Sequence, residues 1–277
     1  MSVDLKTKTE ICYSIVRSLA KRGALYEEAI ANIYRHLIST NGILVDGGAN
    51  VGRHTVSMAR HVTDGHVFAF EPVPQLFGLL MTEVEKRNLL SVVDARMIAL
   101  SNKTGQADFI FFNGPNPEHP DRPLWNAGYS ALQVSGTSSG WQREVIRVGL
   151  TTLDDELRGL NRVDFIKLDL EGGEFHALQG ARTILRQFRP VIAFEDARNA
   201  GDVYGYRRQE FATFIDQCGF HFRSIFGISY TCEQWLDSAI WRPHYSLAMP
   251  NEFEAETPLR EAVDQALSTF NIGVLFS

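Results

Sequence analysis

Short apolar runs alternate along the first hundred residues with segments whose apolar residues recur at helical spacing. Residues 43–47 and 66–70 are two such runs, each with the length and composition of a strand buried on both faces. Residues 51–62 and a segment opened by Pro74 have the spacing of helices, and residues 94–100 are the third predicted strand. The order predicts a β-α-β-α-β unit, which requires right-handed crossovers and a parallel sheet.

The alternation is interrupted between residues 106 and 150. Residues 107–112 and 144–150 have the composition of strands, but residues 113–123 contain four prolines and cannot lie inside a sheet. We therefore predict an inserted hairpin whose long loop carries Trp125 and Tyr129. Loops of this length are usually functional lids, and the aromatic side chains favour a lid over a substrate; a surface loop with no role is the alternative.

The second half of the chain returns to the same pattern. Residues 163–169 and 190–194 are predicted strands, and a helix with an apolar face from Phe175 to Phe188 lies between them. Residues 220–228 and 245–249 can supply two further strands. We expect an N-terminal helical extension over 1–40, one domain over 41–250 with the insertion at 106–150, and a C-terminal helix and tail over 251–277.

Composition narrows the functional classes. The 27 basic and 33 acidic side chains give a net charge of -6, which provides no general attraction for nucleic acid. Three scattered cysteines, Cys12, Cys218 and Cys232, do not form a disulfide framework or a metal-ligand pattern. Residues 1–6 begin no signal peptide, and no apolar stretch is long enough to cross a membrane, so we expect a cytoplasmic protein.

Carboxylates follow most of the predicted strands. Asp46 ends the first strand, Glu71 follows the second 25 positions later, Asp169 ends the fourth, and Glu195 and Asp196 follow the fifth. In an open doubly wound sheet, ligands bind beyond the carboxyl ends of the strands, so these acids should meet at one edge. Each acid alone could simply cap the helix after its strand; together they indicate a binding site.

The turn after the first strand argues against a phosphate-bearing ligand. No Lys-Ser or Lys-Thr pair follows Gly52, and Gly47, Ala49 and Gly52 do not supply the three glycines of the dinucleotide fingerprint. Asn50 would also crowd a pyrophosphate. S-adenosylmethionine, which has a ribose, an ammonium and a carboxylate but no phosphate, suits a turn that offers an acid and backbone N–H groups.

Five segments in this order resemble the FkbM-type family of S-adenosylmethionine-dependent methyltransferases. They are Val45 to Gly52, Phe70-Glu71-Pro72, Thr152-Leu153-Asp154, Lys167 to Glu174, and Leu178 to Ala181. The resemblance implies the α/β class I methyltransferase fold, a Rossmann-like, seven-stranded, mostly parallel sheet with helices on both faces and the last strand antiparallel. It also implies O-methylation of a hydroxyl on a sugar or a small-molecule natural product.

The resemblance also implies roles for residues at the strand ends. The cofactor-binding set is Asp46, Gly47, Gly48, Asn50, Gly52, Glu71, Pro72, Ser101 and Asp169, with Glu71 on the ribose and Ser101 on the adenine side. We predict Asp169 or Glu195 as the base that takes the acceptor's proton, or as ligands of Mg²⁺, Ca²⁺ or Mn²⁺ together with Asp196. Trp125, Tyr129 and His176 are the predicted substrate-binding residues.

Three other functions stay open at this point. An N-methyltransferase of the same fold would need less help with deprotonation of its acceptor. A nicotinamide-dependent oxidoreductase would use the same kind of sheet, although its glycine fingerprint is missing. A binding module without turnover would keep the fold alone. We expect a small-molecule or glycan acceptor, and neither nucleic acid nor membrane as a partner; the acceptor's identity and a homodimeric state are not determined by the sequence.

Overall fold

The structure is a computed structural model that describes residues 22–112, 143–196, 200–237, 243–253 and 256–270, together with residues 7, 9, 10, 14 and 16. Within these ranges, no helix combines the length and the apolar character needed to cross a bilayer. The loop at 113–142, with the predicted lid and its Trp125 and Tyr129, lies outside the described residues.

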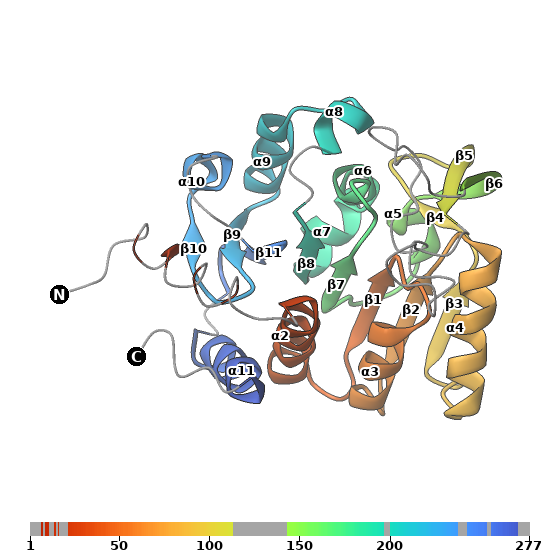
Figure 1. Cartoon of the computed structure of the whole chain (residues 1–277), viewed down its shortest axis with the longest axis horizontal. Coiled ribbons are helices and arrows are strands. Elements are labelled where there is room, and N and C mark those ends of the chain that lie inside the picture. Colours follow the sequence, from red (N-terminus) through yellow and green to blue (C-terminus); the bar gives the residue numbers. More distant parts are fainter. Residues whose placement is uncertain are drawn as a thin grey trace.

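An eight-stranded sheet forms the centre of the molecule (Figure 1), in the order β10-β9-β11-β8-β7-β1-β2-β3. The strands are β1 (Ile43–Gly47), β2 (His66–Phe70), β3 (Val93–Arg96), β7 (Phe165–Leu168), β8 (Val191–Glu195), β9 (Phe220–Ser224), β10 (Ser229–Tyr230) and β11 (Tyr245–Pro250). Neighbouring strands from β3 to β8 pair in parallel, whereas β11 runs antiparallel to both β8 and β9. The expected class I methyltransferase fold with an antiparallel last strand is therefore confirmed.

The number of strands differs from the expected seven. Residues 220–228 do not form one strand, because the chain turns at Gly227, whose φ is +82°. Ser229 and Tyr230 then pair antiparallel with β9 as the short edge strand β10. The turn was missed because apolar residues continue from Phe220 and Phe222 through Ile225, Phe226 and Ile228, so Gly227 alone marks the reversal.

Helices cover both faces of the sheet. They are α2 (Arg22–Leu37), α3 (Arg53–His61), α4 (Pro74–Lys86), α5 (Leu153–Glu156), α6 (Glu174–Gln179), α7 (Arg182–Phe188), α8 (Ala200–Tyr204), α9 (Arg208–Gln217), α10 (Cys232–Leu236) and α11 (Glu256–Thr269). The connections from β1 to β3 and from β7 to β8 proceed in opposite directions along the sheet, so right-handed crossovers place their helices on opposite faces. Near the chain ends, α2 packs against α11 (Figure 1).

The predicted single helix after Gly173 is divided into α6 and α7. The division falls at Gly180, where a Cβ atom would lie 2.2 Å from the carbonyl oxygen of Ser101. A side chain at this position would force the helix away from the strand ends. The close approach therefore explains why glycine stands between the two helices.

A second, smaller sheet contains the predicted hairpin. Its strands are β4 (Ala99–Leu100), β5 (Gly105–Phe112) and β6 (Arg143–Thr151), in the order β4-β6-β5, with β5 antiparallel to β6. The predicted strand over 94–100 is therefore wrong as a single element, because β3 ends at Arg96 and the chain passes to the second sheet. The pairing of β5 with β6 is as predicted, while the domain boundaries stay a prediction.

Candidate functional site

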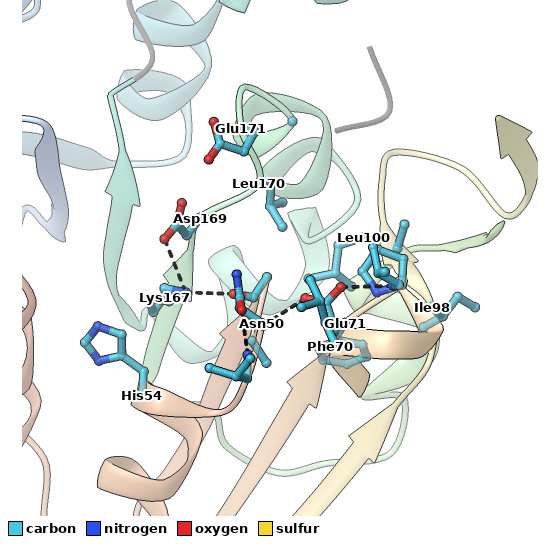
Figure 2. Close-up of a pocket in the computed structure, with 18 of the residues that line it drawn as sticks. Asn50, His54, Phe70, Glu71, Ile98, Leu100, Lys167, Asp169, Leu170 and Glu171 are labelled. Carbon is cyan, nitrogen blue, oxygen red and sulfur yellow. Dashed lines mark hydrogen bonds and ion pairs between the residues drawn. The ribbon is translucent and has the colours of Figure 1, made fainter. Parts of the chain in front are cut away.

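A cavity of about 440 Å³ opens beyond the carboxyl ends of β1, β2 and β7. This is where the order of strands reverses, since the chain winds from β1 toward β3 on one side and from β7 toward β8 on the other. In Figure 2, Glu71, Ile98 and Leu100 lie on one side of the cavity, and Asp169 and Glu171 lie on the other. The strand register produces this arrangement. Gly47 of β1 pairs with Phe70 of β2 and with Leu168 of β7, so the residues that follow these three strands meet at the same edge of the sheet.

The glycine turn after β1 forms the floor of the cavity. Gly48 has a φ of +70°, and a Cβ there would lie 1.9 Å from the carbonyl oxygen of Asp169. Gly52 has a φ of +87° and begins α3, but neither Gly47 nor Gly52 is among the lining residues. Asn50 lines the cavity with a φ of 51°, and its side-chain Oδ1 accepts a hydrogen bond from Val51 N at 2.8 Å.

Glu71 presents a buried carboxylate to the cavity. Its side chain accepts hydrogen bonds from Val73 N at 2.9 Å and Asn50 N at 2.8 Å, and only 4% of the residue is exposed. Burial raises the pKa of Glu71 to about 7, although these two hydrogen bonds lower it. Each carboxylate oxygen retains acceptor capacity, so Glu71 can still receive hydroxyl groups of a ligand. The adjacent Pro72 also lines the cavity.

Asp46 does not line the cavity but lies beneath it. Its carboxylate is fully buried, accepts a hydrogen bond from Thr55 Oγ1 at 2.6 Å, and is 3.1 Å from Lys167 Nζ. Lys167 also donates to the Gly48 carbonyl at 3.0 Å and lies 3.7 Å from Asp169 Oδ2. Burial alone would lower the pKa of Lys167, but the charges of Asp46 and Asp169 raise it. Asp46 therefore anchors the lysine that supports Asp169.

Apolar side chains form the part of the cavity next to Glu71. They lie in or just before α4, β4 and β5 and are Val73, Leu76, Ile98, Leu100 and Phe109. Ser101, the predicted adenine-side residue, is not among them, since its backbone N–H donates to Thr151 and its carbonyl packs against Gly180. The residues just before it face the cavity instead. This apolar slot could not be identified from the sequence. Leu100 and Phe109 reach it from β4 and β5 of the second sheet, and the sequence does not show that the chain leaves the main sheet after Arg96.

Three carboxylates gather on the opposite side of the cavity, where Asp169 and Glu171 line the wall and Glu195, which is not a lining residue, lies next to them. Oxygen atoms of Asp169, Glu171 and Glu195 all lie within 4.8 Å of one another. Tyr245 OH donates to Asp169 Oδ2 at 2.7 Å, and His244 Nε2 lies 2.6 Å from Glu195 Oε1. We call Asp169, Glu171 and Glu195 the carboxylate cluster.

Asp196 does not join the carboxylate cluster, so the structure does not bring it to the other predicted metal ligands. It receives hydrogen bonds from Arg208 at 2.6 and 3.4 Å. Consecutive residues at a strand end point to opposite faces, so Glu195 and Asp196 cannot both reach the same wall. Glu171, from the turn after β7, takes the third position instead.

Negative charge accumulates at this wall. Burial and the nearby charges of Glu195 and Asp169 raise the pKa of Glu171. Burial raises the pKa of Glu195 despite its hydrogen bond with His244, and that hydrogen bond raises the pKa of His244. Chemically, such a wall can accept a proton or hold a cation.

Helix α2 contributes one acid that was not predicted. Glu27 lines the cavity, and its carboxylate is 2.7 Å from His54 Nε2 and 3.6 Å from Arg53 Nε. Burial alone would raise the pKa of Glu27, but the hydrogen bond and charge of His54 lower it to about 2. Only the helical spacing of this segment was visible in the sequence, and a single glutamate on a helix carries no signal of a cavity.

His176 lies outside the main cavity. Its ring faces Tyr204 and Tyr206, each with ring centroids 5.9 Å away, in a separate groove beside α6 and α9. Its predicted role in substrate binding at the cavity is therefore not supported by its position. The residue is the third of α6, and its side chain lines the same groove as Tyr206.

Comparisons with known proteins identify one family. The model of the methyltransferase FkbM domain matches residues 46–222. Methyltransferase sdnD of Sordaria araneosa is 29% identical over 163 residues, which cover 52% of this chain and 61% of that protein. Methyltransferase 1 of Beauveria bassiana (strain ARSEF 2860) is 26% identical over 150 residues, covering 50% of this chain and 58% of that protein. The matched region thus spans about three fifths of each relative's length.

Two solved methyltransferase structures are among those similar to this chain. Methyltransferase FkbM from Methylobacillus flagellatus KT is 16% identical, with a TM-score of 0.45, over 76% of this chain and 44% of that chain. The O-methyltransferase from Bacillus cereus, in complex with SAH, is 13% identical, with a TM-score of 0.43, over 90% of this chain and 92% of that chain.

Proposed function

Because the chain belongs to the methyltransferase FkbM domain family, we propose that it is an S-adenosylmethionine-dependent O-methyltransferase acting on a hydroxyl of a sugar or small-molecule natural product. The observation that supports this most directly is the pairing of two walls in one cavity. Glu71 and an apolar slot form one wall, and Asp169 within the carboxylate cluster forms the other. One wall suits a nucleoside, and the other suits removal of a proton from an acceptor.

The described residues fit S-adenosylmethionine. Glu71 has spare acceptor capacity for the ribose hydroxyls, and Ile98, Leu100 and Phe109 provide an apolar surface for adenine. The cavity volume of about 440 Å³ lies in the range of small-molecule sites, roughly 300–1,000 Å³. The backbone of the Gly48 turn lies between the two walls and would hold the methionine end.

The charges of the cavity favour a sulfonium over a pyrophosphate. Among the residues that the structure describes, four acids line it, namely Glu27, Glu71, Asp169 and Glu171, against the two cations Lys167 and Arg53. Burial raises the pKa of Glu71 and of Glu171, so these two acids carry less than a full negative charge near neutral pH until a cation binds. Lys167 is already paired with Asp46, so little positive charge is left for phosphate groups. A nicotinamide dinucleotide would meet repulsion at this site, whereas a positively charged donor is attracted.

Asp169 is the residue that we assign to proton removal. Tyr245 OH and Lys167 Nζ both approach its Oδ2, which fixes the carboxylate and leaves Oδ1 for the acceptor hydroxyl. When bound, the cofactor supplies a methyl group whose bond to sulfur breaks, its electron pair staying on sulfur, as the bond to the acceptor oxygen forms. Asp169 takes the hydroxyl proton and releases it to solvent. The walls of the cavity align the acceptor with the donor.

Methyl transfer from radiolabelled S-adenosylmethionine to a panel of sugars and polyketides tests the proposal. Mass spectrometry and NMR of the product show whether oxygen or nitrogen carries the new methyl group. We expect O-methylation that requires Asp169. Transfer to amines alone would replace the proposal with an N-methyltransferase, and failure to bind S-adenosylmethionine or S-adenosylhomocysteine by calorimetry would end it. A cytoplasmic location belongs to the same proposal and is tested by fractionation.

A further inference from the structure

We propose that Asp169, Glu171 and Glu195 bind a divalent metal ion at the wall of the cavity. The geometric basis is that one oxygen from each carboxylate lies within 4.8 Å of the other two. Two ligands on opposite sides of Ca²⁺, at about 2.3–2.6 Å each, are separated by about this distance. A smaller ion such as Mg²⁺ or Mn²⁺ requires the side chains to close by a short rotation.

A second observation points to a cation at the same place. Glu195 is only 6% exposed, and its Oε1 is held by His244 at 2.6 Å. Its other oxygen, Oε2, is buried without a hydrogen-bond partner among the residues that the structure describes. A buried charged oxygen with no partner is costly, and a bound metal ion removes that cost.

The surrounding charges leave the carboxylate cluster short of positive charge. Lys167 is 3.7 Å from Asp169 but closer, at 3.1 Å, to Asp46, so its charge is shared. His244 faces Glu195 only through Oε1. Over the described ranges, Glu171 has no ion pair with a lysine, arginine or histidine. A divalent ion would supply the missing charge.

The ligand set selects the kind of ion and suggests its use. Carboxylate oxygens without histidine or cysteine suit Mg²⁺, Ca²⁺ and Mn²⁺ rather than Zn²⁺ or Cu²⁺. Such ions take six or more ligands, so positions remain for water or acceptor oxygens. If the proposed function holds, an acceptor with two neighbouring oxygens, such as a vicinal diol, would chelate the ion, which would make its hydroxyl more acidic.

Titration of the full chain with Mn²⁺, followed by electron paramagnetic resonance of the free ion, tests the site without cofactor or acceptor. We expect one saturable site that Mg²⁺ or Ca²⁺ displaces. Glu171→Gln should weaken Mn²⁺ binding about tenfold or more, because it replaces one charged ligand with a neutral amide of similar shape. Glu85→Gln is the matched control, since it removes an exposed carboxylate from α4 far from the cavity, and should bind as the wild type does.

Thermal unfolding of each variant shows whether it is folded, and Asp169→Asn repeats the test at a second ligand. No saturable Mn²⁺ binding by the wild type up to millimolar concentration would overturn the proposal. Equal affinity in the wild type and in both folded ligand variants would do the same. The two proposals fail separately. Methyl transfer by a wild type that shows no saturable Mn²⁺ binding would remove the metal site but keep the methyltransferase, whereas saturable Mn²⁺ binding without methyl transfer would keep the metal site and remove the proposed function.

Discussion

Glu71 should make both stability and cofactor affinity depend on pH. Burial raises its pKa from 4.5 to about 7, so the folded chain keeps this proton at pH values where the unfolded chain has lost it. The stability that the protonated group provides is therefore fully present below pH 4.5 and lost as the pH rises through 7. With these two values, the free energy of unfolding falls by about 2 kcal/mol between about pH 5.5 and about pH 8.5 because of this group alone.

Urea unfolding of the wild type and of Glu71→Gln at both pH values isolates this contribution. Other buried acids titrate in both proteins, so only the change in the difference between them belongs to Glu71. We expect the wild type to lose about 2 kcal/mol relative to the variant as the pH rises. A difference that stays constant within about 0.5 kcal/mol would refute the assignment of a raised pKa to Glu71.

The same titration should appear in ligand binding. The ribose hydroxyls need the carboxylate form, so S-adenosylhomocysteine should bind the wild type about tenfold more weakly near pH 6 than near pH 8. The affinity of Glu71→Gln should be weaker at both values and should lack this dependence. Calorimetry measures both affinities, and a wild-type affinity that does not change with pH would place the ribose elsewhere.

Three further predictions test other parts of the site. Asp169→Asn should slow methyl transfer about 100-fold or more and leave S-adenosylhomocysteine affinity near that of the wild type; a wild-type rate in a single-turnover assay would exclude it as the proton acceptor. Lys167→Met should lower the free energy of unfolding by about 3–5 kcal/mol because Asp46 stays buried without its cation. Urea unfolding of the double variant Lys167→Met with Asp46→Asn should show a smaller loss than Lys167→Met alone. Equal losses in the single and double variants would contradict the pairing of Lys167 with Asp46. Gly48→Ala should unfold at a clearly lower temperature because its Cβ meets a carbonyl oxygen at 1.9 Å, whereas Gly78→Ala, whose Cβ meets nothing within 4 Å, should stabilise α4 by up to about 1 kcal/mol.

The strand ends were predictable because their pattern is local. Each apolar run has a length suited to a buried strand and ends at a carboxylate, so right-handed crossovers bring Asp46, Glu71 and Asp169 to one edge. The register confirms this, since Gly47 pairs with Phe70 on one side and Leu168 on the other. The pattern could not show how deeply each acid is buried. Asp46 lies two residues before Gly48, where the cavity floor begins, and it is paired with Lys167.

The path of residues 94–112 could not be predicted from composition. Its apolar and β-branched residues fit one continuous strand followed by a hairpin, and only packing against the edge of the main sheet shows that the chain changes sheets after Arg96. The apolar slot depends on that change, because Leu100 and Phe109 reach the cavity from the second sheet and Ile98 from the segment that leads into it. Such a crossing leaves no turn residue as a marker in the sequence.

Choosing between neighbouring acids also required coordinates. Glu195 and Asp196 are equivalent in the sequence, but Arg208 holds Asp196 away from the cavity. Glu171 gave no sign of its role because it lies in a turn, where an acid is usually solvated. Lys167 was noticed only as part of a family segment, since its partner Asp46 is distant along the chain.

Helix α2 has a practical consequence for truncated versions of this protein. Residues 46–222 would be an obvious fragment to express, since they match the family model. That fragment lacks Glu27 from one end, and His244 and Tyr245, which hold Glu195 and Asp169, from the other. Expression trials should therefore retain both flanks, because the cavity and its supporting contacts are completed by side chains that lie outside the segment by which the family is recognised.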